Sequence, residues 1–207
     1  CMHQIMQDLL FLLLCLRCAL GAASPRFAAS YGSHMVLQQA PRRAVVWGYH
    51  HGHGGVVLEL DGEAVDVADG GEPNSWIAKL PPTAGGTEPH TLALWGGGAA
   101  GNATQRQVLD DVLFGDVWVC SGQSNMAFLL EHAFSGAALV NASSDHAEHL
   151  RMFTSFKTNA ATPRAEATVE EPWSVSGPSA VSMNRRAQDL GGPLDDDWLY
   201  MSAVCYL

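Results

Sequence analysis

A nearly unbroken apolar run at residues 112–120 constrains the fold of this chain more than any other feature. A strand without polar alternation is typical of a parallel sheet, in which both faces of each strand are buried. A polar loop follows at residues 121–125, then a predicted helix at 126–134 and a predicted strand at 150–156. The order strand, loop, helix, strand predicts the start of an α/β domain at residues 111–207.

The chain before this run has a different pattern. Short β-prone runs are separated by Gly, Pro and Asn at intervals of about ten residues, which is typical of antiparallel sheets. These runs lie at residues 44–48, 56–60, 64–68, 76–80 and 90–95. We therefore expect an antiparallel β-sandwich domain at residues 24–110.

The first 23 residues have the pattern of a signal peptide. Their apolar run at 9–16 is too short to span a bilayer, and the small residues Gly21 and Ala23 suit a cleavage site. The sequence starts at Cys1 and has no Lys or Arg before the apolar run, so we interpret its amino terminus as incomplete. A buried strand or helix is the alternative. A cleaved signal peptide implies a protein of the secretory pathway, extracellular or lysosomal, without a membrane span.

Cysteine usage does not indicate a disulfide scaffold. Cys1, Cys15 and Cys18 lie in the predicted signal peptide, so the mature chain keeps Cys120 and Cys205. These two could pair in an oxidising compartment. Each lies in an apolar run, however, and we favour two buried free thiols.

Charge and glycosylation motifs also fit a secreted protein. The chain has 207 residues and a net charge of -10, which argues against nucleic-acid binding because phosphates need basic partners. Asn102 and Asn141 each begin an Asn-x-Ser/Thr motif, so both are predicted glycosylation sites.

Ser124 is the candidate nucleophile. A sharp turn between a parallel strand and a helix exposes a serine hydroxyl, and the helix N-terminus offers backbone N–H groups to a developing oxyanion. Gly122 supplies the backbone freedom that a tight turn needs. The segment is not the G-x-S-x-G elbow of α/β-hydrolases, because Met126 occupies the second Gly position. The structural alternative is that Ser124 is a helix N-cap.

Residues 115–126, Gly-Asp-Val-Trp-Val-Cys-Ser-Gly-Gln-Ser-Asn-Met, resemble the first catalytic block of the sialate O-acetylesterases. These are SGNH-type hydrolases with a flavodoxin-like α/β fold. Residues 31–38 and 45–48 resemble the first strands of the β-domain that precedes the hydrolase domain in this family. Residues 201–207 resemble the start of a family helix. The resemblance thus identifies the chain as an amino-terminal fragment of such an enzyme.

The resemblance implies roles for four residues. Ser124 matches the nucleophile, and its own backbone N–H would contribute to the oxyanion hole. Gln123 and Asn125 match the motif and are expected to shape the turn together with Gly122. A second and a third oxyanion donor, an Asp and a His lie beyond Leu207 in the family pattern. We therefore expect the chain by itself to be inactive, because general-base catalysis contributes roughly 10²–10⁴-fold.

The implied reaction is removal of O-acetyl groups from sialic acids or related glycans, without a cofactor. An acetylxylan-type esterase is an alternative, since esterases that act on plant polysaccharides carry the same motif. A non-catalytic glycan-binding or truncated product is the alternative from another class.

Other clusters favour structural interpretations. His50, His51 and His53 have spacing that could bind a metal, but they lie at an expected turn, and we predict no metal site. The acidic triplet at 195–197 could bind a cation, cap a helix or simply be solvated. Asp145 and His146 pair suitable residue types for catalysis, but they lie in a predicted loop.

Three tryptophans, Trp47, Trp76 and Trp95, could form a sugar-stacking platform in the β-domain. Because all three lie in predicted strands, we expect core positions for them.

Overall fold

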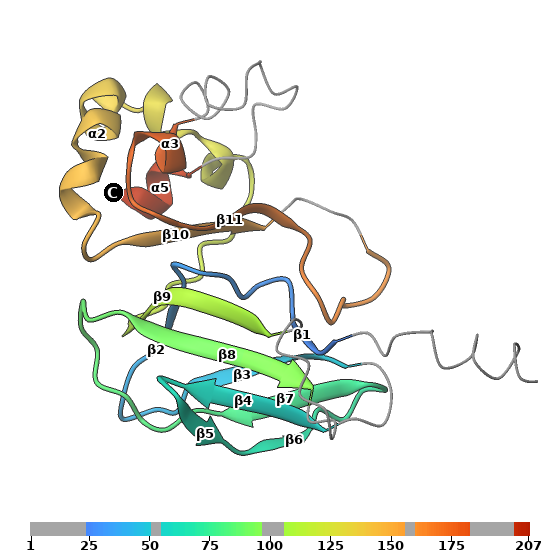
Figure 1. Ribbon diagram of the computed structural model, residues 1–207. Coiled ribbons are helices and arrows are strands. Elements are labelled where there is room, and N and C mark those ends of the chain that lie inside the picture. The colour runs from blue at the N-terminus through green and yellow to red at the C-terminus, as the bar shows by residue number, and fades with distance from the viewer. Residues whose placement is uncertain (1–23, 51–54, 97–105, 156–159, 183–200) are drawn as a thin grey trace, which may run out of the picture.

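The computed structural model describes residues 24–50, 55–96, 106–155, 160–182 and 201–207. Within these residues, two bodies lie one above the other in Figure 1. The lower body consists of sheets, and the upper one contains the short helices and a pair of strands. The predicted signal peptide, Asn102, His51, His53 and the acidic triplet fall outside the described residues.

The lower body contains two sheets. The four-stranded sheet is antiparallel and has the order β1 (Arg26–Phe27), β3 (Val45–Tyr49), β7 (Ser75–Lys79), β6 (Val67–Asp69). The five-stranded sheet has the order β2 (Val36–Gln38), β9 (Gln107–Gly115), β8 (His90–Gly96), β4 (Val56–Leu60), β5 (Glu63–Val65). Its strands pair antiparallel, except that β2 lies parallel to β9.

One apolar core joins the two sheets. Val46 and Trp76 from the four-stranded sheet pack in the same cluster as Leu58, Leu92 and Phe114 from the five-stranded sheet. All five side chains are at most 2% exposed. Burial of apolar surface stabilises by roughly 25 cal/mol per Å², so this shared cluster holds the lower body together.

Four of the expected strand runs overlap an observed strand by at least four residues, namely β3, β4, β7 and β8. The run at 64–68 is divided between the two sheets. Val65 pairs with Leu58 in the five-stranded sheet, whereas Val67 pairs with Ala78 in the four-stranded sheet. The chain therefore passes from one sheet to the other between Val65 and Val67, and the alternation of apolar and polar residues does not reveal this change.

The upper body consists of short elements around a second core. They are η2 (Ser124–Ala127), η3 (Leu130–His132), α2 (Gly136–Ala142), η4 (Ser143–His146), β10 (Arg151–Ser155), β11 (Val169–Val175), α3 (Pro178–Val181) and α5 (Ala203–Tyr206). The core contains Leu130, Val140, Met152 and Val181. Among the described residues, no helix is long and apolar enough to cross a membrane.

The predicted buried strand at 112–120 is wrong in its second half. The strand β9 ends at Gly115, and Val117, Trp118 and Val119 are 42%, 85% and 89% exposed. A strand buried on both faces needs neighbouring strands, and no described strand pairs with residues 116–120. β9 also spans the position at which we divide the chain into domains, and that division stays a prediction.

The predicted helix at 126–134 is replaced by two 3-10 turns, η2 and η3. Between them, Phe128 O accepts a hydrogen bond from Ala203 N (2.8 Å), and Leu130 N donates to Met201 O (3.1 Å). These contacts to a distant segment take backbone groups that a continuous helix needs for itself.

The strand expected at 150–156 is present as β10, but it pairs antiparallel with β11. No βαβ unit is therefore present in the described part of this segment.

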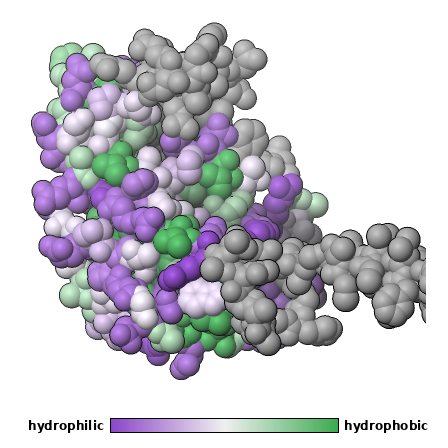
Figure 2. Space-filling view, in the orientation of Figure 1, coloured by the Kyte–Doolittle hydropathy of each residue, from purple (hydrophilic) through white to green (hydrophobic). Residues whose placement is uncertain are grey.

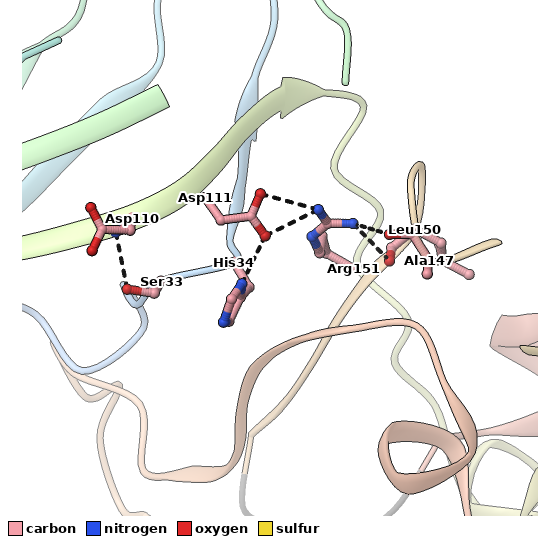
Figure 3. Close-up of polar contacts among 7 residues, drawn as sticks. All are labelled: Ser33, His34, Asp110, Asp111, Ala147, Leu150 and Arg151. Carbon is pink, nitrogen blue, oxygen red and sulfur yellow. Dashed lines mark hydrogen bonds and ion pairs between the residues drawn. The ribbon is translucent and has the colours of Figure 1, made fainter. Parts of the chain in front are cut away.

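A buried arginine joins the two bodies (Figure 3). Arg151 of β10 is 6% exposed, and its Nη2 lies 3.1 Å from Asp111 Oδ2 on β9. The other end of its guanidinium donates to the carbonyl of Ala147. His34 Nδ1 lies 2.7 Å from the same carboxylate. Asp111 thus connects the five-stranded sheet to the upper body.

The environment of Asp111 has opposing effects on its pKa. Partial burial of the carboxylate raises the pKa, but the hydrogen bond with His34 and the charge and hydrogen bonds of Arg151 lower it more. The net pKa lies below the ordinary value. Ionised Asp111 therefore stabilises the fold above its unfolded-state pKa of about 4, and this contribution is lost as the pH falls through the lower folded-state pKa.

Asp111→Asn is accordingly expected to lower the free energy of unfolding at pH 7 and to have a smaller effect near pH 3, below the unfolded-state pKa of about 4, where part of the contribution of the native carboxylate is lost. Urea unfolding at both pH values measures this. Asp110→Asn is the matched control, since Asp110 is an exposed neighbour whose carboxylate bonds to none of the described residues. An equal loss at both pH values would contradict the assignment.

Leu130→Ala tests the second core. Leu130 is fully buried, so truncation leaves a cavity and is expected to cost about 2–5 kcal/mol of unfolding free energy. Phe134, which is 99% exposed, supplies the control, and Phe134→Ala should change stability by less than about 0.5 kcal/mol. Equal losses in the two variants would show that the upper body does not pack as described.

Candidate active site

A cleft of about 840 Å³ lies between the two bodies. Most of its lining comes from three separate parts of the chain: residues 113–124 within and after β9, residues 149–155 around β10, and Met201, Ser202, Cys205 and Tyr206 near α5. Ser124 is in the first of these parts. The sequence-predicted nucleophile therefore faces a space large enough for a small ligand.

Ser124 is the first residue of η2 and is exposed. The cap position belongs to Gln123, whose backbone is extended and whose side chain makes no capping hydrogen bond. The N-cap interpretation of Ser124 is therefore wrong. Since its hydroxyl bonds to none of the described residues, it is free to meet a ligand or a base.

The turn is closed by its own backbone. Met126 N donates to Gln123 O (2.8 Å), and Phe128 N donates to Asn125 O (3.3 Å). Neither Ser124 N nor Asn125 N donates to a described backbone carbonyl. Backbone N–H groups at an exposed serine that donate to no described carbonyl are the kind of donors that stabilise an oxyanion. Because η2 has four residues, its helix dipole is smaller than a full helix would provide.

Gly122 does not adopt a left-handed backbone. A Cβ at this position would lie 3.3 Å from Met126 Cβ, so a larger residue would require Met126 to shift by a few tenths of an ångström. Gly122, Gln123 and Asn125 are all exposed next to Ser124, and their role in shaping the turn stays a prediction.

The prediction of two free thiols is wrong, because Cys120 and Cys205 form a disulfide. Their Cα atoms are 5.9 Å apart, within the range that a disulfide bridges. Cys120 is exposed, and the two residues are separated by 85 positions in the chain. Apolar neighbours in sequence suggested burial, whereas the tertiary fold brings the cysteines together.

Histidines do not complete a triad within the described residues. His149 lines the same cleft as Ser124, but its side chain is 71% exposed, and the charged group beside it is Glu148, 3.9 Å from Nε2. Asp145 and His146 lie in η4, are exposed and do not line the cleft. No described group of three or more His, Cys, Asp or Glu side chains is arranged to hold a metal ion.

Two further groups of predicted residues lie away from the cleft. Trp76 is 1% exposed and belongs to the core, as expected, while Trp47 and Trp95 are half-buried. The guanidinium of Arg106 covers the ring of Trp95 at 4.8 Å. Asn141 is exposed in α2, so it is accessible as the glycosylation motif requires.

Two mammalian proteins are similar to this chain in sequence. The chain is 31% identical over 206 residues to a rat protein named sialate O-acetylesterase, across 96% of the chain and 35% of the rat protein. The mouse protein of the same name is 32% identical over 187 residues, across 88% of the chain and 32% of its length. The chain is a homologue of the sialate O-acetylesterases. It spans about a third of the length of these relatives.

A solved structure has the same arrangement over most of the chain. It is a carbohydrate acetylesterase from Xanthomonas citri, with a TM-score of 0.68 and 25% identity across 88% of this chain and 35% of that one. No protein-family model matches the chain. Sequence and structure thus both lead to acetylesterases that act, by name, on sialate or carbohydrate.

The disulfide is open to direct examination. Digestion of the 207-residue chain without reductant should yield a peptide containing Cys120 joined to one containing Cys205, and dithiothreitol should separate them. Mass spectrometry identifies the pair. Recovery of both peptides with alkylated thiols from unreduced protein would contradict the pairing.

Proposed function

We propose that this chain carries the nucleophile segment of a serine carboxylic ester hydrolase that removes O-acetyl groups from sialic acids or related glycans. The observation that carries the proposal is the position of Ser124. This exposed residue lies at a cleft between two bodies, and its backbone N–H and that of Asn125 donate to no described backbone carbonyl. Homology with sialate O-acetylesterases supports the substrate class.

In the proposed mechanism, Ser124 Oγ attacks the acetyl carbonyl while a base removes its proton. In this step the N–H groups of Ser124 and Asn125 donate hydrogen bonds to the oxyanion of the tetrahedral intermediate. The sugar hydroxyl leaves with a proton, an acetyl-enzyme remains, and water then releases acetate. In this mechanism Ser124 supplies the nucleophile, and the backbone N–H groups of Ser124 and Asn125 are the oxyanion donors. The base is assigned to the part of the relatives that this chain does not span.

The proposed organisation has a cleaved signal peptide at 1–23, a β-sandwich at 24–110 and the start of an SGNH-type α/β domain at 111–207. Two sheets around one core support the first domain. The motif around Ser124 supports the second. Entry into the secretory pathway and glycosylation at Asn141 fit an oxidising compartment, in which the Cys120–Cys205 disulfide is stable.

The wider class of glycan acetylesterases is favoured by one observation, the likeness to a bacterial carbohydrate acetylesterase. An acetylxylan-type substrate is the second candidate on this ground. Comparing acetate release from O-acetylated sialic acid and from acetylated xylan, under the same conditions, distinguishes the two.

Ser124→Ala in the complete natural protein should lower kcat for acetate release by at least about 1,000-fold, since no other group replaces the nucleophile. Ser121→Ala is the matched control, because Ser121 is exposed in the same loop and lines the same cleft. We expect its kcat to stay within a few-fold of the natural protein. Glycan binding that survives both changes, with no turnover in any of the three proteins, would favour a non-catalytic role.

The 207-residue chain by itself is expected to release no acetate above background, because no described histidine hydrogen-bonds to Ser124. Turnover by this chain that Ser124→Ala abolishes would show that a base lies within it. His149→Ala would then test the histidine that shares the cleft.

A further inference from the structure

The segment that leads from β9 to Ser124 has few attachments. Gln39 holds its beginning: Gln39 N donates to Gly115 O (3.1 Å), and Gln39 Nε2 donates to Asp116 Oδ1 (2.9 Å). Residues 117–122 are exposed and make no backbone–backbone hydrogen bond with other described residues. Between Asp116 and η2, the disulfide at Cys120 is therefore the strongest restraint on the path of the chain.

The segment that follows Ser124 is held by the same distant part of the chain. Leu129 and Ser202 form an antiparallel bridge, flanked by hydrogen bonds from Ala203 N to Phe128 O (2.8 Å) and from Leu130 N to Met201 O (3.1 Å). Leu129 and Leu130 are 3% and 0% exposed. This side is anchored by burial as well as by backbone hydrogen bonds.

A third contact reaches the turn itself. Ser202 Oγ lies 3.3 Å from Met126 Sδ, within η2. Residues 201–205 therefore touch the chain before, within and after the turn that holds Ser124. The disulfide and the Leu129–Ser202 bridge close a small ring that has Ser124 on it.

We propose that Cys120 and Cys205 are positioning residues for the proposed nucleophile, and that their disulfide is required for the productive placement of Ser124. This inference rests on the proposed function. With the disulfide intact, the turn is fixed on both sides. Without it, the chain from residue 117 to residue 127 is anchored mainly at its far end, and the exposed Ser124 no longer has one position in the cleft.

The expected cost follows from the geometry of acyl transfer. Reacting atoms must be held about 3–3.5 Å apart, and a misplacement of about 1 Å lowers the rate by roughly 100-fold. Loss of the disulfide should therefore act on kcat, while KM, which depends on the rest of the cleft, changes little. Dithiothreitol supplies two electrons and two protons, which convert the disulfide to two thiols and leave cyclic oxidised dithiothreitol.

The first experiment needs no enzyme activity. Hydrogen exchange of the 207-residue chain is measured before and after reduction at 126–128, where Met126 N and Phe128 N are hydrogen-bonded within the turn, and, as an internal control, at 45–49 in β3. We expect exchange to rise at least tenfold at 126–128 and to stay unchanged at 45–49. Unchanged exchange at 126–128 after complete reduction would overturn the inference, whatever the protein catalyses.

The second experiment measures acetate release by the complete natural protein and by the double variant Cys120→Ser/Cys205→Ser. The double variant should lose about 10- to 100-fold in kcat, keep KM within about twofold, and become insensitive to dithiothreitol. Val140→Ala, in the second core, is the control for stability, since it should lower the melting temperature with kcat unchanged. A double variant that loses melting temperature but not kcat would show that the disulfide is merely structural.

These outcomes separate the two proposals. If Ser124→Ala leaves acetate release intact, the proposed function fails, and the exchange experiment still decides whether the disulfide holds the turn. If the exchange result fails while Ser124→Ala abolishes activity, the nucleophile stands and the positioning role is wrong.

Discussion

The position of the candidate site depends on the pairing of β9 with its two neighbours. β9 lies between β2 and β8, and its side chains Leu109, Val112 and Phe114 are buried in the core shared by both sheets. The same strand carries Asp111, which meets Arg151 of the upper body. It ends at Gly115, from which the chain enters the cleft. One strand thus fixes the lower wall of the cleft and the start of the segment that leads to Ser124.

Besides Asp111–Arg151, several other polar contacts join the upper body to the lower body. Trp173 Nε1 donates to Ser30 O (2.8 Å). Glu166 accepts two hydrogen bonds from Arg26 and one from Ala29 N. The two bodies are therefore joined at several places, and their contact does not depend on a single interaction.

Local sequence patterns predicted those elements of the structure that depend on interactions between residues close in sequence. Strands β3, β4, β7 and β8 follow from short β-prone runs between turn residues, and the motif around Ser124 located the candidate nucleophile. Long-range contacts decided the rest. The Leu129–Ser202 bridge replaces the expected helix, and the disulfide joins cysteines 85 residues apart, so neither is visible in a window of the sequence. The apolar run at 117–119 was assigned to a buried strand, yet no described strand covers it.

The central claim is that Ser124 is the nucleophile, and covalent labelling tests it most directly. The complete natural protein is incubated with a fluorophosphonate, which reacts with activated serines, and the modified peptide is sequenced by mass spectrometry. We predict a single adduct on Ser124 and loss of acetate release in proportion to labelling. An adduct on another serine, or full acetate release with Ser124 fully modified, would contradict the account.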